Sequence, residues 1–183
     1  MKGFLHRKGK EGVNGALSVL SFCCNCLNPE IEGSHIDALL AARGPQEFHV
    51  SSGIVYAVPN NGSSSKFIND KEMRGMITIM FRGGGVSLAD KVFAAQMSGA
   101  LGVIFIDNGS CDENFKSCGL KNGFGAQDEW YLWEMVNIPC ILVTKEGGVR
   151  LNDLLKPDTI FIPNIGYQRI IHDDSHVKII DEL

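Results

Sequence analysis

The sequence predicts an α/β fold, and three consecutive segments indicate it. Residues 76–81 and 101–107 are apolar on both faces, which is typical of strands buried within a parallel sheet. Between them, residues 88–98 place small and apolar side chains at helical spacing. We therefore expect a βαβ unit whose two strands are parallel.

The helix of this unit has a recognisable start. Residues 82–85, Arg-Gly-Gly-Gly, turn the chain after the first strand. Ser87 is a suitable N-cap, and Asp90 completes a Ser-x-x-Asp capping box. Small residues along the apolar stripe allow the helix to pack close to a sheet, and we expect Gly99 or Gly102 to end it.

The segments before this unit predict one short helix and one strand. Residues 34–43 predict the helix, which Ser34 caps and Gly44 ends. Residues 53–58 predict the strand, which Pro59 ends.

After the βαβ unit, a long polar and glycine-rich loop occupies residues 108–129. Residues 138–143 predict a third buried strand, and Thr144 can cap a helix that follows it. Further strands are expected at 159–162 and 176–180.

Length and composition predict one domain with tails. The 183 residues are 44% hydrophobic, enough for one core, and 21% charged, as in ordinary soluble domains. The net charge of -4 argues against nucleic-acid binding, and no run approaches the roughly 20 apolar residues that span a bilayer. We expect an N-terminal tail over 1–46, disordered or signal-like, a domain over 47–165 and a C-terminal tail over 166–183.

Several segments, taken in order, carry a family resemblance. Residues 82–92 resemble the signature of the protease-associated (PA) domain family, in which an apolar strand runs into Arg-Gly and then an acid-Lys pair. Residues 95–104 are similar to that family's helix and strand, 138–147 to its Ile-Pro…Lys-Glu-x-Gly segment, and 53–59 to its first strand. The resemblance covers about residues 48–156. It implies a β-sandwich or open barrel with a βαβ unit and flanking short helices.

The resemblance implies a non-catalytic module that binds or gates polypeptide segments, without a cofactor or metal. The family's parent proteins include proteases, sorting receptors, ubiquitin ligases and mannosidase-like proteins of the endoplasmic reticulum (ER). Aromatic side chains beside the long loop can anchor a partner or fold back over the core, Phe124 among them. Arg82 can pair with a carboxylate or shape a peptide groove. The residues expected to bind a partner are Arg82, Ser87, Asn108, Trp130, Tyr131 and Trp133.

The cysteines depart from the family pattern. Many members pair a cysteine after the Arg-Gly turn with one in the loop after the first strand, but Gly85 or Val86 and residues 63–65 stand there instead. Cys111 and Cys118 flank a polar loop, either as a disulfide or as two free thiols. Cys140 lies in an apolar run, which predicts a buried thiol.

The two ends of the chain suggest the secretory pathway. Residues 2–10 are basic and 16–24 are apolar, an order similar to a signal peptide, although Glu11 interrupts it. Residues 181–183, Asp-Glu-Leu, match the end of an ER-retention signal, with Ile180 in place of Lys or His. The ER lumen is thus one expected location, and the cytoplasm is the alternative.

Other chemistries have weaker signals. A small phosphate- or nucleotide-binding protein that uses the Gly83–Gly85 turn is the alternative function, but Leu88 stands where the dinucleotide motif needs a small residue. His172 and His176 can ligate a metal from one helical face or lie in a solvated turn. Since no nucleophile-elbow motif occurs, we expect no enzymatic activity.

Overall fold

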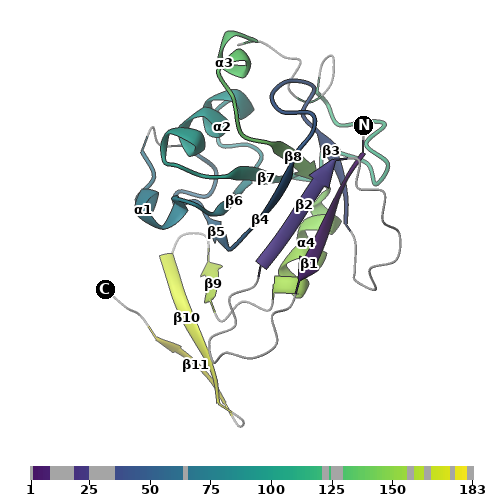
Figure 1. Cartoon of the computed structure of the whole chain (residues 1–183). Coiled ribbons are helices and arrows are strands. Elements are labelled where there is room, and N and C mark those ends of the chain that lie inside the picture. Colours follow the sequence, from purple (N-terminus) through teal and green to yellow (C-terminus); the bar gives the residue numbers. More distant parts are fainter. Residues whose placement is uncertain are drawn as a thin grey trace.

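The protein is represented by a computed structural model, which describes residues 2–8, 19–24, 36–63, 66–120, 124, 130–155, 159–162, 166–173 and 176–180. The larger sheet in this part of the chain has eight strands in the order β4-β2-β1-β3-β8-β7-β6-β5 (Figure 1). Their bounds are Lys2–Lys8 (β1), Val19–Cys24 (β2), Ile36–Leu40 (β3), His49–Ser52 (β4), Ile54–Tyr56 (β5), Ile77–Phe81 (β6), Gly102–Ile106 (β7) and Cys140–Val143 (β8).

The sheet is mixed. Strands β5, β6, β7 and β8 are parallel to one another, and β3 joins β8 antiparallel. Strands β1, β2 and β4 continue the antiparallel part. A second sheet among the described residues, in the order β11-β10-β9, is antiparallel; its strands are Thr159–Ile162 (β9), Gly166–Asp173 (β10) and His176–Ile180 (β11).

Four helices occur in the described residues: Asp70–Met73 (α1), Leu88–Met97 (α2), Trp130–Glu134 (α3) and Lys145–Leu155 (α4). The predicted helix over 88–98 and both flanking strands are confirmed. Ser87 caps α2 as expected, because its Oγ accepts a hydrogen bond from the Asp90 amide at 3.0 Å. Thr144 caps α4 in the same way, with its Oγ1 accepting from the Gly147 amide at 3.0 Å.

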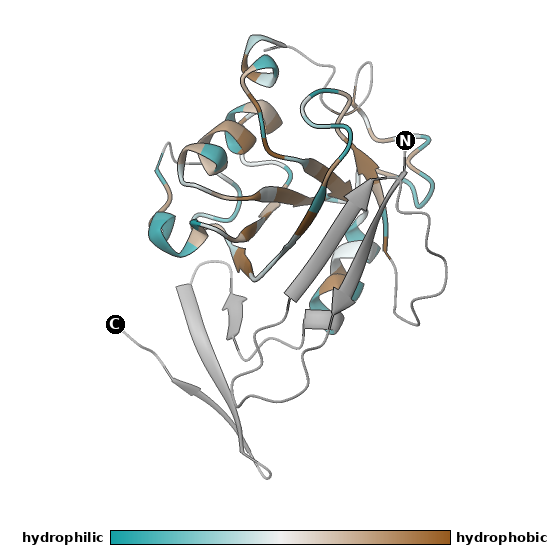
Figure 2. Ribbon diagram, in the orientation of Figure 1, coloured by the Kyte–Doolittle hydropathy of each residue, from teal (hydrophilic) through white to brown (hydrophobic). Residues whose placement is uncertain are grey.

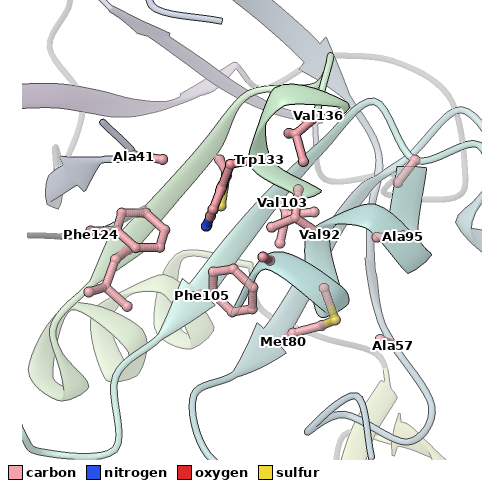
Figure 3. Packing of buried hydrophobic residues seen from close by; sticks show 14 of the residues in the cluster. Ala41, Ala57, Met80, Val92, Ala95, Val103, Phe105, Phe124, Trp133 and Val136 are labelled. Carbon is pink, nitrogen blue, oxygen red and sulfur yellow. The ribbon is translucent and has the colours of Figure 1, made fainter. Parts of the chain in front are cut away.

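Strands β6, β7 and β8 are buried on both faces, which explains their continuous apolar sequences (Figure 2). One face packs with α4, where Ile79, Ile104 and Leu151 belong to the same cluster. The other face packs with α2 and α3 (Figure 3). Its central members include Met80, Val92, Ala95, Val103, Phe105, Phe124 and Trp133.

The helix predicted over 34–43 is wrong, because residues 36–40 form β3. Ile36, Ala38 and Leu40 are buried while Asp37 is exposed, which is the period-two pattern of a strand. Pairing of β3 with β8, far away in sequence, overrides the local helical signal. The sheet therefore extends into the segment that the sequence predicts to be a tail.

The other predicted strands are all present, two of them with shorter bounds. The strands expected at 53–58 and 138–143 appear as β5 and β8, and those at 159–162 and 176–180 as β9 and β11. Strand β10 was not predicted. It pairs with β11, so the segment that carries His172 and His176 is a strand pair and not the helix that would place both histidines on one face.

Candidate functional site

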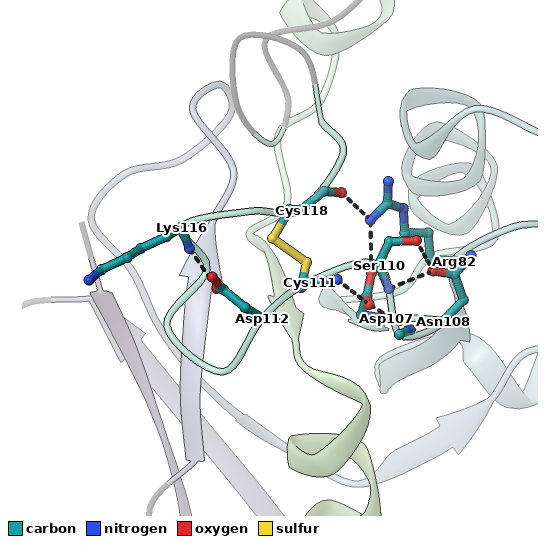
Figure 4. The surroundings of a disulfide bond; sticks show 9 residues. Arg82, Asp107, Asn108, Ser110, Cys111, Asp112, Lys116 and Cys118 are labelled. Atoms are coloured by element: carbon teal, nitrogen blue, oxygen red, sulfur yellow. Dashed lines mark hydrogen bonds and ion pairs between the residues drawn. A yellow bond between two sulfur atoms is a disulfide. The ribbon is translucent and has the colours of Figure 1, made fainter.

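The side chains of Arg82 and Asp107, at the carboxyl ends of β6 and β7, form an ion pair that we call the brace (Figure 4). Arg82 follows β6 and Asp107 follows β7, so the parallel strands bring the two side chains together. An Nη of Arg82 donates to the Asp107 carboxylate at 2.8 Å and to the Cys118 carbonyl at 2.7 Å. Of the two roles left open for Arg82, pairing with a carboxylate is the one that the structure shows.

The carboxylate of Asp107 is fully engaged inside the protein. Its second oxygen accepts hydrogen bonds from the amides of Gly109 and Cys111, at 2.7 and 2.9 Å. Burial by itself raises the pKa of Asp107, but the amide of Cys111, the guanidinium of Arg82 and the amide of Gly109 together outweigh burial and hold that pKa below its usual value. Asp107 is therefore ionised, and both of its carboxylate oxygens accept hydrogen bonds from within the protein.

In the structure a disulfide joins Cys111 to Cys118, one of the two states that the sequence leaves open. Both cysteines are buried, and both backbones contact the brace through Asp107 and Arg82. The bridge closes the start of the long loop, and the two backbone hydrogen bonds tie it to the ends of β6 and β7. Cys140 is a buried free thiol, as predicted, and burial raises its pKa.

The glycine turn before α2 is shaped by a buried lysine. Gly83, Gly84 and Gly85 all have positive φ angles, which glycine adopts without strain. Lys91, only 1% exposed, donates from its Nζ to the carbonyls of Gly83 and Phe81 at 2.6 and 2.9 Å. Lys91 therefore holds the glycine turn in place and links the end of β6 to α2.

The environment of Lys91 also acts on its charge. Desolvation by burial lowers the pKa of Lys91 to about 8. The side chain packs on Gly62, where an added Cβ would come within 2.7 Å of Lys91 Cγ. Sequence reasoning noted this lysine in the acid-Lys pair but did not identify it as a buried clamp.

The predicted partner-binding residues separate into two groups. Trp133 is 2% exposed and packs edge-on against Phe124, which in turn packs edge-on against Phe105, so Trp133 and Phe124 belong to the core (Figure 3). Tyr131 on the same helix is exposed. The side chain of Trp130 lies outside the described residues.

Asn108 and Ser87 are placed at the same end of the sheet as the brace. Asn108 is exposed, and its Oδ1 accepts hydrogen bonds from the amide and hydroxyl of Ser110 at 3.2 and 2.6 Å. The Ser87 hydroxyl donates to Asp90 Oδ2 at 2.8 Å as part of the α2 cap. These residues make local contacts, and their role in binding stays a prediction.

A groove with a volume of about 600 Å³ runs along the outer side of α2. One wall is the helix face opposite to the core face, a stripe at helical spacing made of Asp90, Phe93, Ala94, Met97 and Ser98. The other wall comes from the segment that contains α1, and includes Lys66, Phe67, Asp70, Lys71 and Arg74. We call this site the α2 groove.

The α1 wall is held in place at both ends. The Asn69 side chain acts like a neighbouring strand for the edge of β5, donating to the Tyr56 carbonyl at 2.8 Å and accepting from the Val58 amide at 2.9 Å. At the other end, the Gly75 amide donates to the Gly99 carbonyl, just after α2, at 2.8 Å. The two walls are therefore fixed relative to each other before any ligand binds.

Sequence reasoning missed the α2 groove. One signal was available: Phe93 and Met97 lie four residues apart on the helix face that does not reach the core, and Met97 is 71% exposed. An exposed methionine beside a half-buried phenylalanine on a surface helix is a candidate contact surface. The opposite wall, however, comes from a separate segment, which helical periodicity alone does not reveal.

Comparison with known protein families identifies the family of this chain. Residues 50–151 match the PA domain, and this match spans more than half of the chain. The chain therefore belongs to the PA domain family, whose members are protease-associated modules that often mediate protein interaction. Nothing in the comparisons supports the expected ER mannosidase-like context. Comparison with curated proteins gave no significant match.

Two solved structures are similar over part of their length. The aminopeptidase from Aneurinibacillus sp. strain AM-1 shares 21% identity with 84% of this chain, at a TM-score of 0.47. BSAP, a zinc aminopeptidase from Bacillus subtilis, shares 16% identity with 82% of this chain, at a TM-score of 0.39. The chain covers 30% of the length of each enzyme.

Across the described residues, no helix has the length and apolarity needed to cross a membrane. Those residues also contain no cluster of three or more metal-ligating side chains.

Proposed function

We propose that this protein is a non-catalytic module that binds a polypeptide segment in the α2 groove. The observation that supports the proposal is the groove itself, about 600 Å³ in volume and lined by both apolar and charged side chains between two fixed walls. The volume falls within the range of about 300–1,000 Å³ that is usual for ligand sites. Fixed walls favour binding, because little conformational entropy is lost when the ligand arrives.

The reactive side chains near the sheet support a non-catalytic role. Asp107 is ionised and saturated with hydrogen bonds, Lys91 is buried beneath the glycine turn, and Cys140 is a buried thiol with a raised pKa. None of these three groups is accessible to a substrate, and a nucleophile needs both access and a neighbouring base. Their positions fit structural roles.

Half-buried Ser87, exposed Asn108 and exposed Tyr131 are the further partner contacts in this proposal. Ser87 and Asn108 lie beyond the carboxyl ends of β6 and β7, where open α/β sheets commonly bind ligands, whereas Tyr131 lies on α3. Arg82, by contrast, serves the brace, and Trp133 serves the core. The proposal therefore retains Ser87, Asn108 and Tyr131 as partner contacts on the surface.

We also propose that the larger sheet curls into the open barrel that the family resemblance implies. Strands β4 and β5 stand at opposite ends of the strand order, yet only Gly53 separates them in the sequence. Chain continuity thus brings the two ends of the sheet together, which is what barrel closure needs.

A peptide-binding measurement tests the proposed function. The probe is a fluorescent peptide of alternating serine and leucine, titrated with the full chain and followed by anisotropy. We expect saturable binding that Ala94→Trp abolishes, because the indole fills the groove beside Phe93. Val149→Trp, at an exposed position of α4, is the matched control and should leave binding unchanged. Mass spectrometry should recover the peptide uncleaved.

Binding that persists in Ala94→Trp would move the site away from the α2 groove. Peptide cleavage that copurifies with the chain and survives in both tryptophan variants would contradict the non-catalytic role.

A further inference from the structure

We propose that the α2 groove selects an extended polypeptide segment in which acidic and apolar side chains alternate. This inference rests on the proposed function and adds the chemistry of the ligand. It follows from a difference between the two walls. Apolar side chains predominate on the α2 wall, with Phe93, Ala94 and Met97 beside one carboxylate, Asp90. Cations predominate on the α1 wall, with Lys66, Lys71 and Arg74 beside Phe67 and Asp70.

The charge balance of the groove favours an acidic ligand. The lining carries three cations, Lys66, Lys71 and Arg74, against two carboxylates, Asp70 and Asp90, so it is net positive while the chain as a whole carries -4. Among the residues that the structure describes, neither Lys71 nor Arg74 has a carboxylate within ion-pair distance.

Asp70 is next to Lys71 on α1, but the other carboxylate, Asp90, lies apart from Arg74. Asp90 lies at the amino end of α2 and is already bound by the Ser87 hydroxyl. Arg74 lies at the carboxyl end, where its side-chain stem packs near Gly99: a Cβ on that glycine would lie 3.2 Å from Arg74 Cγ. The cationic end of the groove is therefore the end beside Arg74 and Met97.

The dimensions favour an extended segment over a helix. From Asp90 to Ser98 the α2 wall is about 12 Å long, at about 1.5 Å per helical residue. About four extended residues cover that length, and at strand and sheet spacings they fill roughly 600 Å³. A bound helix, about 10–12 Å across, would place only one of its faces in a groove of this volume.

Alternation follows from the geometry of an extended chain. Successive side chains of a strand point in opposite directions, so one set faces α2 and the other faces α1. Apolar side chains then contact Phe93 and Met97, and acidic ones reach Lys71 and Arg74. The segment that fits both walls at once alternates between the two classes.

The test compares three fluorescent peptides on the full chain: alternating Glu-Leu, Lys-Leu and Ser-Leu. We expect Glu-Leu to bind more tightly than Lys-Leu by about tenfold or more, and to weaken with added salt. The double variant Lys71→Glu with Arg74→Glu should reverse this preference. The matched control, Lys116→Glu with Arg150→Glu, changes the same charges at exposed positions outside the groove and should retain it.

Each outcome decides between the claims. Equal affinities for the three peptides, with binding still abolished by Ala94→Trp, would overturn the acidic preference and leave the proposed function standing. A preference for Glu-Leu that survives the Lys71 and Arg74 reversal would place recognition elsewhere and overturn the inference. Failure of all three peptides to bind would overturn both the inference and the proposed function.

Discussion

The brace at the ends of β6 and β7 and the groove along α2 are both rich in charged side chains, but they use them differently. In the brace, Arg82 and Asp107 contact each other and the backbone of the disulfide loop. In the groove, Lys71 and Arg74 face open space. Charged residues near a sheet edge therefore do not indicate a binding site by themselves. They can bind a ligand only where other groups of the protein do not already pair with them.

The largest expected effect belongs to the brace. Asp107→Ala leaves the mostly buried guanidinium of Arg82 without its carboxylate and should lower the free energy of unfolding by about 3 kcal/mol. Asp70→Ala in the groove removes an exposed carboxylate and should change it by less than about 0.5 kcal/mol. Urea denaturation followed by circular dichroism measures both. Similar losses for the two variants would remove the distinction between brace and groove.

The same carboxylate predicts a dependence on acid. Since the folded pKa of Asp107 is lower than its unfolded value of 3.8, its contribution is present above that pH and is lost as the pH falls through the folded pKa. The wild type should therefore lose stability below about pH 4 more steeply than Asp107→Asn. If the free energy of unfolding falls equally steeply in acid for the two proteins, the brace does not depend on this charge.

Lys91, which lies between the two regions, predicts a dependence of stability on alkaline pH. Its pKa is about 8 in the folded protein and 10.5 in the reference state, so the unfolded chain binds more protons between these values. Stability should rise over this interval, by at most about 1.4 kcal/mol per pH unit. Comparison of denaturation curves with those of Lys91→Met isolates the effect. A rise of equal slope in the variant would assign it to other groups.

The smallest effect is expected in the groove. The double reversal of Lys71 and Arg74 to glutamate should change the free energy of unfolding by less than about 0.5 kcal/mol, because both side chains are exposed and unpaired among the described residues. A thermal melt checks this. A large loss would show that these cations stabilise the fold, and the groove would then resemble the brace.

The sequence predicted the local elements of this fold well, and it was weakest where distant segments meet. The βαβ unit and the caps at Ser87 and Thr144 depend on neighbouring residues, and all were confirmed. The helix over 34–43 was wrong because pairing of β3 with β8 decides its conformation. A short apolar segment fits either periodicity when its partner strand is unknown.

The candidate site shows the same limit. Sequence reasoning left two roles open for Arg82, and only the contact with Asp107, 25 residues away, distinguishes them. It also gave Tyr131 and Trp133 equal standing, although α3 turns the first outward and the second into the core. The α2 groove was not predicted at all, because its walls are separate segments that meet only in the folded chain.

The most direct test of the account is to map peptide contacts by nuclear magnetic resonance. Amide shifts of the labelled chain are recorded during titration with the Glu-Leu peptide. The account predicts that the perturbed amides concentrate in residues 66–74 and 90–98, along the two walls of the α2 groove. Perturbations concentrated instead in residues 107–118, around the brace and its disulfide loop, would contradict the assignment of the binding site to the groove.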